Sequence, residues 1–523
     1  MPRLKRKKSA EDTGSQGPAP KAKPPSRGRR GGGGAGGAGG DHLAAHLFVR
    51  ALGLVYLLAF VSLGWQIGGL VGRDGVFPFA RLLAAAKAQL GSAAWQQVPT
   101  LLWLSSSDDA LDAVWLLGAT AAVLALLGRL VAPALALAWL CYLSLVVVGR
   151  DFLEFQWDSL LLEAGLLAIF LLPPALHSRF AEGAPFKAPL WLLRFLLFRL
   201  MWGSGLVKLL SGDPSWRSLE ALEVHYETQP LPSFLGWWAH QMPPAMHQAA
   251  TLLMFLVELL APLLIFAPAR FRRLAFLPLA GLQLVIAATG NYGFFNLLSL
   301  ALCLLLLDDA AFPRRWASRA KPQAPTVAGR ILEFSFWPLG AALGLLALVV
   351  FASATLRIKA DWPQPLVSLY RQAAPFRSVN SYGLFAVMTM ERHELFVEGS
   401  RDGREWEAYT FKWKPEDPLE APSFVAPHMP RLDWQMWFAA LGTPDGSFIR
   451  TLLSRLAEGD RAALELFAHN PFPDGPPNFL RVRRERWRFT DRSTRSATGA
   501  WWSRQDEGYF LPPTATERLV LPP

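Results

Sequence analysis

Three cations interrupt one long apolar stretch of the chain, and they are the first residues whose chemistry stands out. Arg194, Arg199 and Lys208 lie within residues 189–210, and ionisable side chains inside an apolar segment of that length are costly in a bilayer. Glu163 lies in the preceding apolar stretch. The pattern predicts an ion pair between Glu163 and either Arg199 or Arg194, and the alternative is a path for protons or substrate.

Lys208 lies near the end of its apolar stretch, and this position allows two roles. A lysine among apolar groups can be a catalytic base, because desolvation lowers the pKa of an ammonium group. A lysine at a helix end can instead extend its charge to the membrane interface, and we expect this snorkelling role. The chain has no Walker loop, no GxSxG motif and no GxGxxG between a strand and a helix. No catalytic group beyond the weak candidate Lys208 is therefore predicted.

The segment 211–248 gathers imidazole and carboxylate side chains that could bind a metal. They are His225, Glu227, His240 and His247, and the phenol of Tyr226 lies between the first two. Their spacing does not fit the HExxH pattern, which places two imidazoles and a carboxylate on one helix. The sequence predicts no metal site and no cofactor, and the tryptophans of this segment indicate that it lies on the membrane surface.

A membrane domain must position these residues. Of the 523 residues, 52% are hydrophobic and only 18% are charged, and the apolar residues come in long runs. A membrane core about 30 Å thick needs about 20 apolar residues per helix, so these runs predict eight or nine spans. The runs are 47–70, 111–127, 130–148, 160–173, 189–210, 249–266, 274–289, 294–307 and 336–356. Two of them, 160–173 and 294–307, are short enough to be re-entrant.

The positive charge of the chain is concentrated in a tail at residues 1–42. Ten Lys or Arg residues lie among the first 30, against a net charge of +11 for the whole chain. The tail is rich in Pro and Gly, so we expect it to be disordered. Basic residues before a first span keep that end in the cytoplasm, and this explanation is preferred to nucleic-acid binding.

Basic residues recur in alternate loops between the runs. They are Arg129, Arg179, Lys187, Arg270, Arg272, Arg273, Arg314, Arg315, Arg319, Lys321 and Arg330. Nine alternating spans place these loops in the cytoplasm with the tail. Everything after Leu356 then lies on the far side, in the endoplasmic reticulum lumen of a eukaryote or the periplasm of a bacterium.

Residues 357–523 have the pattern of a folded domain outside the membrane. Alternating apolar residues at 394–398 and 406–411 flank an Asp-Gly turn and predict a β-hairpin. Helices are expected at 432–441, 448–458 and 461–468, and a late strand at 481–489. The predicted fold is an α-helical multi-pass membrane domain of eight or nine spans (43–356), followed by a β-rich α+β exoplasmic domain (357–523).

Six motifs in both predicted domains resemble the lipase maturation factor family of multi-pass membrane proteins. They are FQWDSLLLE (155–163), HYETQPLP (225–232), GNYGFFN (290–296), NSYGLF (380–385), VEGSRDG (397–403) and RLDWQMWFAAL (431–441). They occur in family order between about residues 45 and 510, and the chain resembles the second vertebrate paralogue more than the first.

The resemblance implies an endoplasmic reticulum membrane protein that assists folding and assembly of secreted lipases through its lumenal domain. Its partners would be the lipid bilayer and secreted clients, and no enzyme activity is implied. The C-terminal domain has no Cys, since Cys141 and Cys303 both lie in apolar runs. That feature suits a bacterial member, in an inner membrane and with a different client.

A distant resemblance supports an alternative function. The residues around Gly205–Lys208 and Asp213–Trp216 are similar to the helical domain of vitamin K-dependent γ-carboxylases. In those enzymes a lysine at the membrane face is the catalytic base. The alternative function is therefore that of a membrane enzyme with Lys208 as its base.

The motif at 431–441 has more apolar surface than one helix face can bury. Part of it should remain exposed as an interaction patch, and we expect this patch and the 225–232 loop to contact client proteins. The candidates are His225, Tyr226, Glu227, Leu432, Asp433, Trp434, Gln435, Met436 and Trp437.

Overall fold

The computed structural model describes residues 40–173, 183–317, 327–443 and 448–520. Most of the tail predicted to be disordered, residues 1–39, lies outside the described residues, as do Arg179, Arg319 and Lys321. Within the described residues, the first helix begins at His42, directly after Asp41.

Each of the nine apolar runs forms a helix. Among the described residues, seven helical segments are long and apolar enough to cross a membrane. Their helices are α1 (His42–Gly64), α5 (Asp108–Leu126), α6 (Val131–Gly149), α8 (Lys187–Leu210), α12 (Pro244–Leu260), α13 (Ala269–Thr289) and α16 (Val327–Val350). The two short runs form α7 (Gln156–Ile169) and α14 (Phe295–Leu304). The predicted multi-pass helical domain is confirmed.

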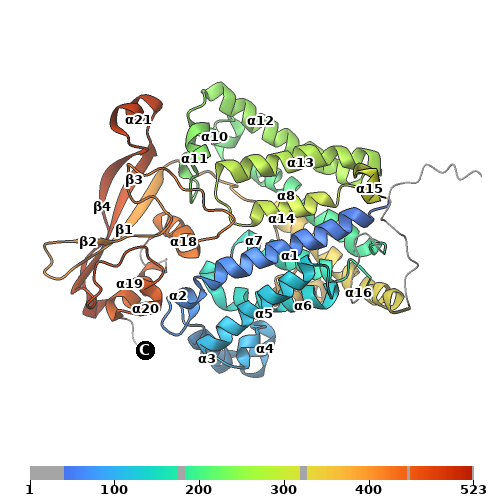
Figure 1. Cartoon of the computed structure of the whole chain (residues 1–523), viewed down its shortest axis with the longest axis horizontal. Coiled ribbons are helices and arrows are strands. Elements are labelled where there is room, and N and C mark those ends of the chain that lie inside the picture. The colour runs from blue at the N-terminus through green and yellow to red at the C-terminus, as the bar shows by residue number, and fades with distance from the viewer. Residues whose placement is uncertain (1–39, 174–182, 318–326, 444–447, 521–523) are drawn as a thin grey trace, which may run out of the picture. The chain divides into compact units, whose positions relative to one another are not determined.

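Ion pairs at one end of the bundle show which helices begin there and which end there. Asp41, at the start of α1, accepts hydrogen bonds from Arg194 of α8 at 2.8 Å and from Arg272 of α13 at 2.9 Å. The same two guanidinium groups donate to the carbonyls of Leu305 and Leu306, which follow α14. The starts of α1, α8 and α13 therefore meet the end of α14. Figure 1 shows α1, α14 and α13 side by side.

Shorter helices lie between the long ones, and one, α17 (Gln364–Ala373), follows the last of them. The others are α2 (Ile67–Val71), α3 (Phe79–Leu90), α4 (Ala94–Gln97), α9 (Pro214–Arg217), α10 (Ala221–Thr228), α11 (Phe234–His240) and α15 (Arg314–Ala317). Two of them, α10 and α11, lie in the segment expected on the membrane surface.

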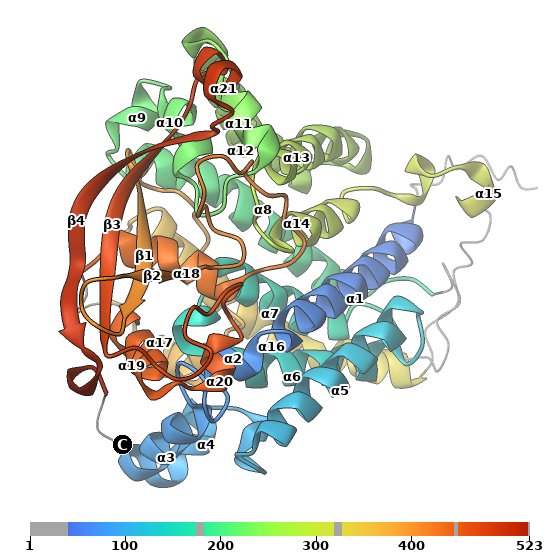
Figure 2. The ribbon, with the colours of Figure 1, turned by 60° about the vertical axis from the view of Figure 1, so that its left-hand side comes forward.

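The C-terminal region is built on a four-stranded antiparallel sheet with the order β2-β1-β3-β4. Its strands are β1 (Arg392–Ser400), β2 (Glu407–Tyr409), β3 (Phe479–Phe489) and β4 (Trp502–Ala515), and its helices are α18 (Arg431–Ala440), α19 (Ile449–Glu458), α20 (Arg461–Leu464) and α21 (Arg492–Thr498). The predicted hairpin is confirmed, because Val397 pairs with Tyr409 across a turn in which Gly403 has φ +75°. Figure 2 shows α18 lying between the sheet and the membrane helices.

Membrane helices and C-terminal domain share one hydrophobic core, which includes Leu52 and Leu161 of the helices and Leu432 and Val482 of the C-terminal domain. Residues Gly39–Pro523 accordingly form one compact unit. Polar contacts cross the same boundary: the Gln66 side chain donates to Met429 O and accepts from Arg431 N, both at 2.8 Å. The C-terminal domain is therefore packed against the ends of the membrane helices.

Candidate functional site

Arg431, the first residue of α18, is inserted between the membrane helices. Its guanidinium group donates to both carboxylate oxygens of Asp158 in α7, at 2.6 and 2.7 Å. The hydroxyl of Tyr142 donates to the same carboxylate at 2.5 Å. Burial lowers the pKa of Arg431, but the nearby Asp158 carboxylate more than offsets this, so its pKa is raised. Arg431 is thus a buried, charge-paired anchor for α18.

Glu163 forms the second buried link between the two regions. Its carboxylate pairs with Arg199 and accepts hydrogen bonds from the Tyr382 hydroxyl at 2.7 Å and the Asn380 amide at 3.1 Å. The other candidate cation, Arg194, is paired with Asp41 instead. Within the NSYGLF motif, Asn380 and Tyr382 thus complete a network that sequence reasoning did not include.

The predicted 225–232 loop is the last turn of α10 together with the residues that follow it, and the C-terminal sheet holds this segment. Arg392 at the start of β1 donates to the carbonyls of Glu227 at 3.1 Å, Gln229 at 2.5 Å and Pro230 at 2.9 Å. The Glu227 carboxylate accepts the backbone N–H of Phe489 at 2.6 Å, while burial raises the pKa of Glu227. This segment therefore joins the membrane domain to the C-terminal sheet, and the Tyr226 side chain is buried in it.

The 431–441 motif is exposed only in part, and the candidate contact residues within it are not its most exposed members. Four of them, Leu432, Trp434, Met436 and Trp437, are buried, because α18 is enclosed by the sheet on one side and the helix ends on the other. Asp433 is buried too, and its carboxylate accepts the backbone N–H groups of Trp413 and Lys414 at 2.7 and 3.0 Å. Gln435 is half-buried. The exposed part of the motif is Phe438, 42% exposed, and Leu441, 47% exposed.

Phe438 borders a cleft of about 340 Å³ at the junction of α18 and the membrane helices. We call it the aromatic cleft and define it by Phe155, Trp157, Val387, Trp434, Trp437 and Phe438. Phe155 stacks on Trp157 with ring centroids 4.6 Å apart, and Phe438 lies 5.8 Å from Phe155. Val387 at the rim is 66% exposed. Two predicted contact residues, Trp434 and Trp437, thus line a cleft although little of their own surface is exposed.

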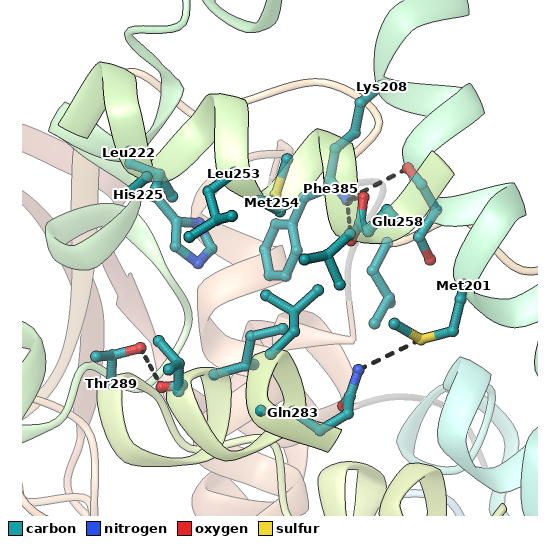
Figure 3. A pocket seen from close by; sticks show the side chains of 18 of the residues that line it. Met201, Lys208, Leu222, His225, Leu253, Met254, Glu258, Gln283, Thr289 and Phe385 are labelled. Carbon is teal, nitrogen blue, oxygen red and sulfur yellow. Dashed lines mark hydrogen bonds and ion pairs between the residues drawn. The ribbon is translucent and has the colours of Figure 1, made fainter. Parts of the chain in front are cut away.

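A second cavity, of about 420 Å³, lies between α8, α10, α12 and α13. Figure 3 shows Lys208 and Glu258 meeting at one side of it. The Lys208 ammonium donates to the two Glu258 carboxylate oxygens at 2.9 and 2.8 Å and to Ser204 O at 3.2 Å. The snorkelling expectation for Lys208 is therefore wrong, because its charge is buried and all three of its N–H groups have acceptors.

The three histidines of this segment have different main contacts, although His247 lies close enough to His240 to help lower its pKa. His225 faces the cavity of Figure 3, His240 is 3.8 Å from the Glu227 carboxylate, and His247 is buried at the start of α12. Burial lowers the pKa of both His225 and His240 to about 4. Among the described residues, no group of three or more His, Cys, Asp or Glu side chains could hold a metal ion.

The fold and this site define a multi-pass membrane protein whose C-terminal α+β domain is anchored in the ends of its membrane helices by buried ion pairs. Two family models match the chain: the lipase maturation factor transmembrane domain over residues 43–314, and the lipase maturation factor C-terminal domain over residues 378–512. The chain belongs to the lipase maturation factor family.

Several curated relatives are similar over most of their length. Lipase maturation factor 2 of Gallus gallus is 36% identical over 89% of this chain and 80% of its own. Lipase maturation factor 2 of Homo sapiens is 35% identical over 90% of this chain and 83% of its own. Lipase maturation factor 1 of Bos taurus is 33% identical over 99% of this chain and 96% of its own. No solved structure matches. These relatives do not favour the membrane-enzyme alternative.

Proposed function

We propose that this protein is an integral membrane maturation factor that assists the folding or assembly of secreted proteins, with lipases as the client class. The names of its relatives supply that class. The observation that carries the proposal is the aromatic cleft, an open apolar surface at the junction of α18 and the membrane helices. Open apolar surfaces on a folded protein mark sites of interaction.

The side chains of the aromatic cleft are suited to bind an incompletely folded protein chain. Stacked aromatic side chains offer large apolar area at a small cost in side-chain entropy. The exposed rim residues Phe438 and Val387 allow an apolar segment of a client to reach that area from outside the membrane. In this proposal the buried residues Leu432, Asp433, Met436, Tyr226 and Glu227 act indirectly, by holding α18 and the 225–232 loop in place.

We also propose the orientation that this role requires. Residues 1–42 form a cytoplasmic tail, residues 43–356 the membrane domain and residues 357–523 the domain in the lumen of the endoplasmic reticulum, or in the periplasm for a bacterial member. The basic residues at the Asp41 end of the bundle, such as Lys187 in α8 and Arg270 in α13, support this orientation. The aromatic cleft, at the opposite ends of the helices, then faces the compartment of secreted clients.

Site-specific photocrosslinking in intact membranes tests the proposal. A photoactivatable residue at Phe438 or Val387 should capture a co-expressed secreted lipase, and capture should rise when lipase folding is blocked. The matched control is Phe334, an exposed side chain of α16, which should capture only lipid. Crosslinks from 438 and 387 that contain only lipid, or only this chain, would contradict the client role.

A further inference from the structure

The cavity of Figure 3, here called the membrane cavity, is walled mainly by aliphatic and thioether side chains of α8, α12 and α13. Two of its lining residues, Leu253 of α12 and Val285 of α13, are 61% and 58% exposed. The membrane cavity therefore opens sideways between two helices that are each long enough to cross a membrane. An occupant can reach it from the hydrocarbon of the bilayer.

The charged side chains that line the membrane cavity are already neutralised. Lys208 and Glu258 hold each other in the ion pair described above. The Gln283 amide is used as well, since its Oε1 accepts from Asn296 at 2.9 Å and its Nε2 donates to Met201 Sδ at 3.5 Å. A charged head group would find no free counter-charge among these lining residues, and burying an unpaired charge is costly. The membrane cavity thus favours an uncharged occupant.

His225, which lines the membrane cavity, supplies one buried polar atom without a hydrogen-bond partner among the described residues. The Gln229 amide group donates through Nε2 to Thr289 O at 2.8 Å, so its Oε1 accepts the Tyr292 hydroxyl, also at 2.8 Å. Tyr292 has a single hydroxyl proton, so its oxygen accepts from Nε2–H of His225 at 3.2 Å. Nδ1 of His225 is then an acceptor, and it is buried without a partner among the described residues.

The charge state of His225 agrees with this assignment. Burial, with a smaller effect from Lys208, lowers the pKa of His225 to about 4. The ring is therefore neutral at neutral pH, and Nδ1 keeps its lone pair. A buried acceptor without a donor costs free energy that a ligand hydroxyl would recover.

We propose that the membrane cavity binds an uncharged lipid alcohol, such as a diacylglycerol, which enters from the bilayer between α12 and α13 and donates its hydroxyl to Nδ1 of His225. The acyl chain lies among the apolar side chains of α8, α12 and α13. The membrane cavity adjoins the aromatic cleft, since Tyr292, Leu384 and Phe385 line both. Lipid binding in it does not depend on the client role, so either proposal can fail without the other.

Photolabelling in nanodiscs tests the proposal. A photoactivatable diacylglycerol should label peptides of α12 and α13, and unlabelled diacylglycerol should compete, whereas palmitic acid and phosphatidylcholine should not. A sterol is the other lipid alcohol that could enter. If a sterol probe labels α12 and α13 and unlabelled sterol competes with it, the hydroxyl contact is supported and the occupant is a sterol. Equal labelling by palmitic acid, or none above that of phosphatidylcholine, would overturn the proposal.

Gly281 allows the membrane cavity to be filled. A Cβ added at Gly281 meets no atom within 4 Å, so Gly281→Phe places a ring in open space and should remove most of the labelling. The matched control is Leu277→Phe on the same helix, where the side chain is 74% exposed, and labelling should persist. Ala250→Phe is a second variant that should fill the membrane cavity. Mass spectrometry of the lipid that co-purifies with the wild-type protein is a measurement that needs no variant. Unchanged labelling in both folded filling variants would contradict the proposal.

His225→Leu isolates the hydroxyl contact. It should weaken diacylglycerol labelling about fivefold, as expected for the loss of one hydrogen bond, and leave labelling by a triacylglycerol probe, which has no hydroxyl, unchanged. An equal loss for both probes would mean that His225 only shapes the cavity, and the assigned hydroxyl contact would be wrong.

Discussion

Among the described residues, the ion pairs at the end of the bundle where α1 begins join helices to one another, whereas at the opposite end buried charged residues also join the helices to the C-terminal domain. Asp41 pairs with Arg194 and Arg272 at the first end. At the second end Asp158 pairs with Arg431, and Glu163 with Arg199 and the 380–382 segment. Asp41 keeps 23% of its side chain exposed, while Asp158 and Glu163 are buried. The difference indicates that the C-terminal domain is held by buried charge, which is costly to leave unpaired.

The largest expected effect is at Arg431. Arg431→Met leaves the Asp158 carboxylate buried without its cation, and we expect a loss of about 3–5 kcal/mol in the free energy of unfolding. Adding Asp158→Leu should recover most of that loss, but not all of it, because the Tyr142 hydroxyl loses its acceptor. Thermal and denaturant unfolding in mild detergent measures both. A double variant no more stable than Arg431→Met would show that the pair does not anchor the domain.

Glu163 should have the next largest effect. Glu163→Gln leaves Arg199 buried without a carboxylate, with an expected cost of about 3 kcal/mol. A double-mutant cycle with Arg199→Met should show strong coupling, and the matched cycle with Arg194→Met should show none, since Arg194 pairs with Asp41. Coupling of Glu163 to Arg194 in place of Arg199 would refute the observed pairing.

A smaller effect is expected at the opposite end of the bundle. Asp41→Asn removes the shared acceptor charge of Arg194 and Arg272, but Asp41 is partly exposed, so we expect a cost of about 1–2 kcal/mol. Limited proteolysis should show the C-terminal domain still protected in this variant, in contrast to Arg431→Met. Release of the C-terminal domain by Asp41→Asn would remove the distinction between the two ends.

The smallest effect is a pH dependence at the second end only. His428 contacts Ser62 of α1 through Nδ1 at 2.9 Å, and burial, with Arg431 and Lys412, lowers the pKa of His428 to about 4. The unfolded chain binds this proton near pH 6.5, so His428 costs stability as the pH falls from about 6.5 toward 4. Comparing His428→Gln with the wild-type protein at pH 7 and pH 5 should show a difference of about 1 kcal/mol, since His428 is half-buried. If the stability of His428→Gln and of the wild-type protein changed equally with pH, the proposed role of His428 would be wrong.

Much of the helical domain could be predicted from the sequence, because apolar run length and the charge of the loops are local properties of the chain. The pairing of Glu163 with an arginine of α8 could also be predicted from the sequence, since few ionisable residues lie in adjacent apolar runs. The Asp-Gly turn predicted the β1–β2 hairpin for the same local reason.

The anchoring of the C-terminal domain could not be predicted in this way. Arg431 and Asp158 are 273 positions apart, and nothing local in either segment identifies the other as its partner. The burial of α18 likewise depends on surfaces from other elements, such as Phe155 and Trp157, which lie 5.8 and 4.9 Å from Trp434 between ring centroids. Sequence periodicity shows that a helix is apolar, but not how many neighbours enclose it.

The most direct test of the account is the yield of client crosslinks from a probe at Val387, measured across one set of variants. We predict that Phe438→Glu and Arg431→Met both abolish capture of a secreted lipase, the first by placing a charge in the aromatic cleft and the second by releasing α18. The Arg431→Met/Asp158→Leu pair should restore capture, and Asp41→Asn should leave it unchanged. Full capture by Phe438→Glu, with the variant folded, would contradict the claim that clients bind the aromatic cleft.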